Sequence, residues 1–310
     1  MLIVKNLTKT YSLEKQKYCA NKDINFSVAD GKMVWIYGNS GSGKTTLLNM
    51  ISGLDVADQG SVQWNETDIL SLSSNQRADF RLKNMGLVFQ FFDMIKTQSI
   101  FSNVSIPLKL LNTNKSEINK KVYSSLELFG IEKLCNKKPN SLSGGERQRA
   151  AIARAIITKP KILIADEITA SLDTEMSKKV YKILKEYIVK NNCIGIFVSH
   201  DPLIREFADD IYVMKNGSLI KENELYLKLL CLCYKQLEDN RFLDKMETLE
   251  LMNENFRKIA VTNLKISVEF KELSEDEIKT IVENDKVVEN IDKAIEHLIT
   301  ANHSWVSWMR

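Results

Sequence analysis

Gly38-Asn39-Ser40-Gly41-Ser42-Gly43-Lys44-Thr45 is the stretch that decides the fold of this 310-residue chain. It fits the pattern G-x-x-x-x-G-K-[S/T] in full, directly after the apolar run from Met33 to Tyr37. Apolar residues at helical spacing follow between Lys44 and Ser52. The glycines let backbone N–H groups converge on phosphate oxygens, and a helix that begins at Lys44 adds the positive end of its dipole. The sequence therefore predicts a strand, a phosphate-binding loop and a helix.

Other segments extend this unit into an α/β domain. Short apolar runs that end in polar residues predict buried strands, and amphipathic or Ala/Ile-rich stretches predict the helices between them. The expected strands cover residues 2–7, 24–28, 161–165 and 194–198, and the expected helices cover 115–129 and 148–158. Apolar strands separated by helices are typical of a largely parallel sheet. No segment repeats at a fixed period, so the chain holds one copy of this unit.

Asp166 and Glu167 end the apolar run 162–165, where a parallel sheet places its ligands. Adjacent side chains at a strand end point opposite ways, so the two acids can have different roles. We expect Asp166 to bind Mg2+ and Glu167 to polarise an attacking water. We also expect Lys44 to reach the β- and γ-phosphates of a nucleotide and Thr45 to ligate Mg2+. The alternative for the two acids is that they cap the next helix.

A second candidate anion site lies in residues 142–149, Leu-Ser-Gly-Gly-Glu-Arg-Gln-Arg. Ser143, Gly144 and Gly145 stand at a loop-to-helix junction that offers a hydroxyl, bare backbone and a helix N-terminus. Together with the loop at Gly38 and the strand end at Asp166, this string resembles the signature of ATP-binding-cassette (ABC) ATPases. The resemblance covers about residues 1–221. It implies a P-loop ATPase core with a mostly parallel sheet, an antiparallel β subdomain, and a helical subdomain at about 91–140.

The resemblance implies ATP and Mg2+ as cofactors and a dimer as the working form. In the family, Ser143, Gly144 and Gly145 of one copy would close over the γ-phosphate that Lys44 of the other copy holds. A chain with one copy of each loop would have to pair with itself or with a homologous ATPase subunit to hydrolyse ATP.

Several isolated residues acquire roles only through the resemblance. Tyr11 matches the aromatic that stacks on adenine, although a lone tyrosine near a strand end also suits simple packing. Gln90 matches the glutamine that reads Mg2+ and the lytic water, Asp173 belongs to a loop that communicates across the dimer, and His200 matches a γ-phosphate contact. A hydrogen-bonded core residue is the alternative for His200. The expected catalytic residues are Lys44, Gln90, Glu167 and His200. The expected Mg2+ ligands are Thr45, Gln90 and Asp166. The expected ATP-binding residues are Tyr11, Gly38, Asn39, Ser40, Gly41, Ser42, Gly43, Lys44, Thr45, Thr46, Ser143, Gly144, Gly145 and Asp173.

One position departs from the family pattern. Where the family usually has Asp-Glu-Pro-Thr, this chain has Ile168 in place of the proline. Without proline the backbone N–H is free and φ is less restricted directly after the expected base. We therefore expect slower hydrolysis, with both carboxylates retained.

The segments between the motifs resemble the macrolide-exporter and lipoprotein-releasing group of the family. They are residues 47–55, 77–81, 88–94 and 103–108. This implies that the chain drives a separate membrane permease, for export of or resistance to peptides or drugs or for lipoprotein release. The permease would dock on the helical subdomain, with Phe91, Phe92 and Met94 as candidate contacts or as core residues.

Two rival functions share these motifs. A cell-division ATPase of the same branch would gate a membrane partner that transports nothing. A soluble cassette ATPase for DNA repair usually separates its motif halves with long coiled coil, whereas Ser143 follows Lys44 by 99 positions here. A third possibility is an ATP-binding switch that hardly hydrolyses. We expect no nucleic-acid partner.

Composition places a boundary near residue 221. The last glycine is Gly217 and the last proline is Pro202, which predicts a mainly helical extension over 222–310 with few tight turns. Residues 1–221 carry 31 Lys and Arg against 22 Asp and Glu, whereas the remainder carries 12 against 18. The role of this extension is unknown.

Within the extension, residues 274–277 predict a helix start, and Trp305 and Trp308 could pack on the extension itself, pair two extensions or touch a membrane partner. Cys231 and Cys233 are a weak metal signal, and the five cysteines of the chain are expected to be reduced. No run of 18 to 20 apolar residues occurs. We expect the protein at the cytoplasmic face of the membrane, held there by the permease.

Overall fold

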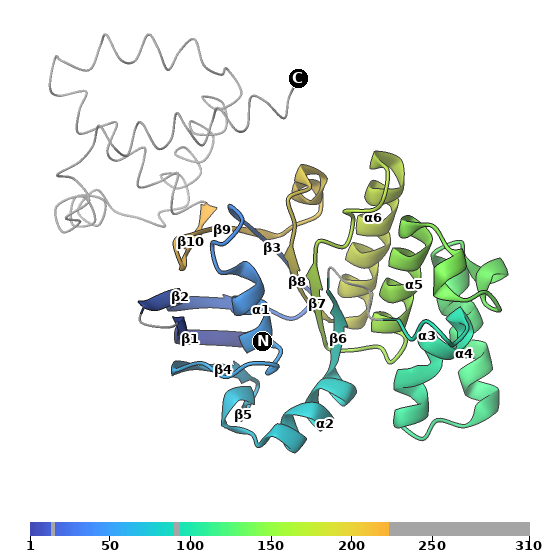
Figure 1. The fold of residues 1–310 in the computed structure, drawn as a ribbon, viewed down its shortest axis with the longest axis horizontal. Coiled ribbons are helices and arrows are strands. Elements are labelled where there is room, and N and C mark those ends of the chain that lie inside the picture. Colours follow the sequence, from blue (N-terminus) through green and yellow to red (C-terminus); the bar gives the residue numbers. More distant parts are fainter. Residues whose placement is uncertain (14–15, 90–93, 223–310) are drawn as a thin grey trace, which may run out of the picture. The chain divides into compact units, whose positions relative to one another are not determined.

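The computed structural model describes residues 1–13, 16–89 and 94–222 (Figure 1). Residues 1–221 form one compact unit. Several expectations lie outside the described residues. They are the helices, cysteine pair and tryptophans of the C-terminal extension, and Gln90, Phe91 and Phe92.

The centre of the unit is a six-stranded sheet. Its strand order is β10-β9-β3-β8-β7-β6, and all neighbours run parallel except β10 and β9. The strands are β3 (Met33–Tyr37), β6 (Met85–Val88), β7 (Ile162–Asp166), β8 (Ile194–Val198), β9 (Asp210–Lys215) and β10 (Ser218–Lys221). Every residue of β7 and β8 is buried, which explains why the sequence shows them as continuous apolar runs.

A second sheet is antiparallel, with the order β2-β1-β4-β5. It consists of β1 (Leu2–Leu13), β2 (Gln16–Val28), β4 (Gln59–Trp64) and β5 (Thr67–Asp68). The β1–β2 hairpin extends well beyond the expected strands at 2–7 and 24–28. Asn6 and Asp23 have positive φ angles of 49° and 47° where the pairing register shifts, and these residue types tolerate that conformation.

Six α-helices occur in the described residues: α1 (Lys44–Ile51), α2 (Ser74–Asn84), α3 (Ile100–Leu110), α4 (Lys115–Leu128), α5 (Gly144–Ile156) and α6 (Thr174–Asn191). Helix α1 lies between the two sheets, whereas α3 to α6 lie on the other side of the central sheet (Figure 1). Because side chains along β3 point alternately to the two faces of the central sheet, the apolar core has two parts, one on each face. Val34 and Ile36 pack with α1 and the antiparallel sheet, and Met33 and Trp35 pack with α5 and α6.

The α/β prediction is confirmed, with one shift in a helix start. Helix α5 begins at Gly144 rather than at Gln148 because Ser143 and Glu146 form a capping box. The Ser143 hydroxyl accepts the Glu146 N–H at 3.2 Å, and the Glu146 carboxylate accepts the Ser143 N–H at 2.7 Å. Glycines in the first helical turn are therefore compatible with a well-capped helix.

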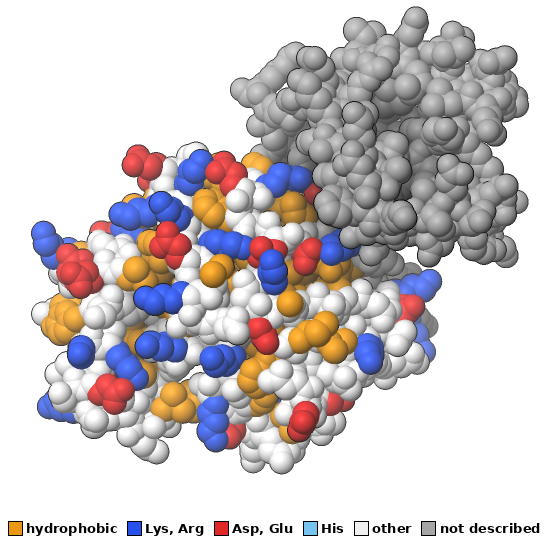
Figure 2. Space-filling model, turned by 180° about the vertical axis from the view of Figure 1, so that it is seen from behind, with side chains coloured by type: hydrophobic (Ala, Val, Ile, Leu, Met, Phe, Trp, Pro, Cys, Tyr) orange, Lys and Arg blue, Asp and Glu red, His pale blue; other side chains and the backbone are white. Residues whose placement is uncertain are grey.

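Positive charge is dispersed over the face of the molecule seen in Figure 2. Lysine and arginine side chains alternate there with acidic and apolar ones among the described residues.

Candidate active site

The loop Gly38–Thr45 leads from β3 into α1 and is fixed by backbone contacts on two sides. Gly43 has φ +103°, and a Cβ there would lie 2.1 Å from the carbonyl oxygen of Ala20. On the other side, the carbonyl of Ser42 accepts the Gly217 N–H at 3.1 Å. Because the Ala20 carbonyl of β2 lies so close, there is no room for a side chain at position 43, which therefore requires glycine.

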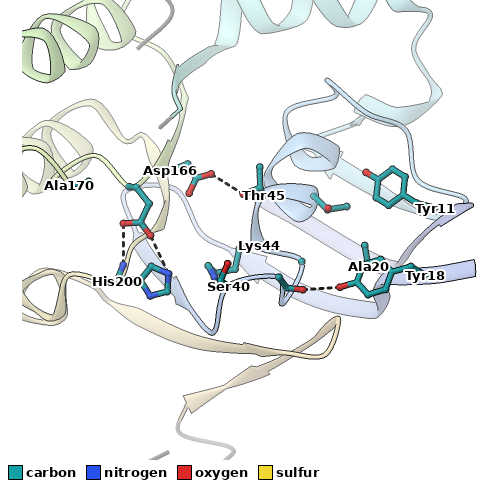
Figure 3. Close-up of a pocket in the computed structure, with 13 residues that line it drawn as sticks. Tyr11, Tyr18, Ala20, Ser40, Lys44, Thr45, Asp166, Ala170 and His200 are labelled. Atoms are coloured by element: carbon teal, nitrogen blue, oxygen red, sulfur yellow. Dashed lines mark hydrogen bonds and ion pairs between the residues drawn. The ribbon is translucent and has the colours of Figure 1, made fainter. Parts of the chain in front are cut away.

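A cavity of about 460 Å³ opens beside this loop (Figure 3). Half of the expected ATP-binding residues line it, together with Asp166, Glu167 and His200. The lining comprises Tyr11, Tyr18, Ala20, Ser40, Gly41, Gly43, Lys44, Thr45, Thr46, Asp166, Glu167, Ala170 and His200. Gly38, Asn39 and Ser42 belong to the same loop without being part of this lining. The structure thus brings together residues that are up to 189 positions apart between Tyr11 and His200.

Lys44 is buried, and its ammonium group lies within the loop itself. Nζ donates to the carbonyl oxygens of Gly38 at 2.7 Å and Asn39 at 2.9 Å. Burial lowers the pKa of Lys44, while the carboxylates of Glu167 and Asp166 act in the opposite direction. A cation held in this way is available to anionic ligand groups at the start of α1.

Thr45 and Asp166 provide a pair of oxygen donors on the floor of the cavity. The Thr45 hydroxyl donates to Oδ2 of Asp166 at 3.1 Å (Figure 3). Asp166 is the last residue of β7 and is 5% exposed; burial raises its pKa, against the effects of Thr45 and Lys44. A hydroxyl and a carboxylate are ligands that Mg2+ accepts, so this donor set fits the expected ion.

Glu167 and His200 both line the cavity and contact each other. Oε2 of Glu167 accepts the His200 backbone N–H at 3.3 Å, and Oε1 lies 3.6 Å from Nε2 of the imidazole. Burial raises the pKa of Glu167, and the contacts with His200 oppose this effect. The carboxyl groups of Asp166 and Glu167 thus have different partners, Thr45 for one and His200 for the other.

Two tyrosines lie at the end of the cavity formed by the β1–β2 hairpin. The Tyr11 hydroxyl donates to Asp55 at 2.8 Å, and Lys9 lies 5.2 Å from the Tyr11 ring centroid. Tyr18 pairs with Tyr11 in the strand register, and its hydroxyl donates to the Gly41 carbonyl at 2.8 Å. Sequence analysis missed Tyr18 because it ended the first strand before Tyr11 and began the second after Tyr18. The same misplacement hid Ala20.

Ser143, Gly144, Gly145 and Asp173 are not among the described residues that line this cavity. Ser143 caps α5, and Asp173 caps α6 by accepting the Met176 N–H at 2.8 Å. That the two loops of one chain do not share a nucleotide stays a prediction. The expected ligand Gln90 lies outside the described residues.

Comparison with known proteins identifies the family. The ABC transporter family model matches residues 21–170. The lipoprotein-releasing system ATP-binding protein LolD of Wigglesworthia glossinidia brevipalpis is 39% identical over 223 residues, which are 72% of this chain and 97% of LolD. The chain belongs to the ABC transporter family of ATP-binding cassette ATPases. The resemblance drawn from the three motifs is thereby confirmed.

Other relatives of the cassette have related names. The ABC transporter ATP-binding protein YxdL of Bacillus subtilis is 39% identical over 73% of this chain and 87% of YxdL. The methionine import ATP-binding protein MetN of Clostridioides difficile is 35% identical over 74% of this chain and 71% of MetN.

A solved structure supports the fold of the cassette. It is the ATP-binding cassette MJ0796, in a dimeric post-hydrolysis state bound to ADP and Pi. It superposes with a TM-score of 0.69 at 33% identity, over 72% of this chain and 98% of MJ0796. In the part of the cassette that the structure describes, no helix combines the length and apolar character needed to cross a bilayer.

Proposed function

We propose that the cassette pairs with a second copy or a homologous subunit around two ATP molecules and drives a separate membrane permease. The observation that carries this proposal is the placement of the two phosphate-facing loops. Lys44 lines the cavity, whereas Ser143 at the start of α5 does not. A complete site then needs Ser143, Gly144 and Gly145 from another chain, and Asp173 would lie at the same contact. The dimeric state of MJ0796 supports this arrangement.

Within each half-site, the described residues suit the parts of Mg·ATP. Lys44 would exchange its contacts with the Gly38 and Asn39 carbonyls for the β- and γ-phosphates, and the backbone N–H groups of the loop would add further donors. Tyr11 would stack on adenine. Thr45 and Asp166, together with Gln90, would hold Mg2+, which neutralises charge on the phosphates when bound.

Hydrolysis would use Glu167 and His200. As the water oxygen forms a bond to the γ-phosphorus, the carboxylate of Glu167 accepts a proton of that water, and the bond to the ADP oxygen breaks. His200, 3.6 Å from the Glu167 carboxylate, would contact the γ-phosphate and keep this carboxylate oriented. Both groups line the same cavity as Lys44, which supports the assignment.

The names of the relatives support coupling to a membrane transport system, whereas the lipoprotein-releasing or exporter kind rests on the resemblance of the segments between the motifs. LolD is named for a lipoprotein-releasing system at 39% identity, and MetN is named for methionine import at 35% identity. We therefore propose only the coupling to a permease, and we expect the permease to determine which cargo is transported. The permease would dock on residues 91–140 and hold the cassette at the cytoplasmic face of the membrane. Met94 is partly buried and packs against the core cluster of α3 to α6, so core packing remains the alternative to a permease contact.

Substitution of Glu167 by glutamine tests the catalytic assignment. Because the neutral amide cannot accept the proton, we expect kcat to fall by about 10²- to 10⁴-fold. ATP binding should survive, so size-exclusion chromatography with ATP should reveal an accumulated dimer. The matched control is Glu206→Gln, which removes an exposed carboxylate that pairs with Lys178. Unchanged turnover of Glu167→Gln would refute the role of Glu167.

Affinity purification of the cassette from detergent-solubilised membranes of its own host tests the permease coupling. We expect a multispanning membrane protein in stoichiometric amount, and we expect it to stimulate or restrain ATP hydrolysis when the complex is reconstituted. A partner that transports no cargo in vesicles would instead favour the cell-division type of function. A cassette that sediments with no membrane component would contradict the proposal.

A further inference from the structure

Gln148 joins helix α5 to the loop that carries Glu167. Its side chain is 1% exposed. Nε2 donates to the carbonyl oxygen of Glu167 at 3.1 Å, and Oε1 accepts the backbone N–H of Ser171 at 3.3 Å. The single amide group of Gln148 therefore forms hydrogen bonds with both ends of one short loop, from Glu167 to Ser171. A buried amide with both ends bonded is well defined in orientation.

The backbone of Glu167 needs such support. Its φ angle is +53°, in the left-handed region that costs a non-glycine residue about 1–2 kcal/mol. Three hydrogen bonds surround this residue. Its N–H donates to Val198 at 2.9 Å, and its carbonyl accepts from Ala170 at 3.3 Å and from Gln148. Unfavourable backbone conformations persist where the surroundings over-determine them, and they cluster at functional sites.

The first turn of α5 packs against the same loop. A Cβ on Gly144 would lie 3.2 Å from Cβ of Ser171, and a Cβ on Gly145 would lie 3.0 Å from Cδ2 of Leu172. Gln148 lies one turn further along α5 than these glycines. The helix that begins at Ser143 and the loop that follows Glu167 are therefore close-packed, and the Gln148 amide contributes a polar connection between them.

We propose that Gln148 is a positioning residue for hydrolysis: it holds the backbone of Glu167 in its left-handed conformation and ties it to the helix that begins at Ser143. This inference rests on the proposed role of Glu167 as the proton acceptor. Gln148 does not line the cavity among the described residues, so it acts through Glu167 and not on the nucleotide.

The test is Gln148→Met, which keeps the length of the side chain and removes both hydrogen bonds. Without the donor, the Glu167 carbonyl loses one partner and the carboxylate is less well placed. We expect kcat to fall at least 10-fold while the affinity for ATP stays within threefold of the wild type.

Ser125→Ala is the matched control. Ser125 is buried and donates to the Ala153 carbonyl of α5 at 3.0 Å, so its loss removes a hydrogen bond from the same helix away from Glu167. We expect this variant to lower Tm about as much as Gln148→Met and to keep the wild-type kcat. Equal loss of kcat in Ser125→Ala and Gln148→Met would mean general destabilisation and would overturn the inference.

A double variant tests whether Gln148 acts through Glu167. If Gln148 acts through Glu167, then Gln148→Met in the Glu167→Gln background should slow single-turnover hydrolysis by less than threefold. Wild-type turnover by Glu167→Gln alone would contradict the proposed role of Glu167 in hydrolysis, on which this inference rests. A slow Glu167→Gln beside a fully active Gln148→Met would leave the proposed function intact and reject the positioning role.

Discussion

The phosphate-binding loop offers a pair of glycines whose substitutions should differ in cost for a reason visible in the structure. Gly41 and Gly43 both have positive φ, +76° and +103°. Among the described residues, no heavy atom beyond its chain neighbours lies within 4 Å of a Cβ built on Gly41. A Cβ on Gly43 would lie 2.1 Å from the Ala20 carbonyl oxygen. The perturbation is alanine at each position in turn.

The expected magnitudes follow from these distances. Gly41→Ala should lower the free energy of unfolding by about 1–2 kcal/mol, which is the cost of a residue with a Cβ atom in the left-handed backbone conformation. Gly43→Ala incurs the same term, and its methyl group must also move from 2.1 Å to an ordinary contact distance, so the loop and β2 must separate by about 1 Å. Overpacking of this kind adds about 1–3 kcal/mol, so the total cost of Gly43→Ala should be about 2–5 kcal/mol.

Urea unfolding of the full chain without nucleotide, followed by circular dichroism, measures both costs. ATP binding by Gly43→Ala should also weaken at least 10-fold, since α1 begins at Lys44, directly after the displaced residue. Equal costs at the two positions would refute the reasoning, because they would mean that the contact with Ala20 does not constrain the loop.

Three further predictions concern other parts of the cassette. Burial raises the pKa of Asp209, but the hydrogen bonds that its carboxylate accepts from Lys185 and from the Met33 N–H outweigh burial and hold the pKa below its ordinary value. Its stabilising effect is therefore present above the ordinary aspartate pKa of about 4 and is lost as the pH falls through the lowered value. Asp209→Asn should therefore cost about 1–2 kcal/mol at pH 7, and urea titrations should show this difference shrinking below pH 4; a constant difference would contradict the prediction. Tyr11→Ala should weaken binding of an ATP analogue about 10-fold, as expected for loss of one base–aromatic stack, whereas Tyr11→Phe keeps the ring and should bind within threefold in titration calorimetry; equal effects would reject stacking. Truncation after Lys221 should leave a folded domain that binds ATP, measured by circular dichroism and nucleotide titration; an insoluble product would place the domain boundary elsewhere.

The parts of the fold that sequence analysis predicted well are those where burial and periodicity agree. β3 and β8 were located to the residue because apolar runs of five are bounded by polar residues and turns. The phosphate-binding loop and the strand end at Asp166 were predicted from motif and topology. Their proximity, 3.1 Å between the Thr45 hydroxyl and Asp166, follows from the rule that parallel strands present their carboxyl ends at one edge.

The features that the sequence did not reveal depend on contacts between distant segments. The outer half of the β1–β2 hairpin consists mostly of polar residues with partial or full exposure, so the sequence shows no apolar alternation that would mark it as strand, and Tyr18 was missed with it. Gln148 lies in a stretch predicted as a buried helix, and nothing in its neighbours indicates that its amide meets the Glu167 carbonyl. Ile168 is 1% exposed and belongs to the apolar cluster that packs with α5 and α6.

The hairpin turn between β9 and β10 gives the phosphate-binding loop a preorganised shape. Gly217 donates to the Ser42 carbonyl at 3.1 Å and accepts the Lys22 N–H at 2.8 Å, so one turn connects the loop with β2. A ligand that meets a backbone already in its binding conformation loses little conformational entropy on binding. Nucleotide capture by this cassette should consequently be limited by diffusion and by release of Lys44 from the Gly38 and Asn39 carbonyls, and not by reshaping of the loop.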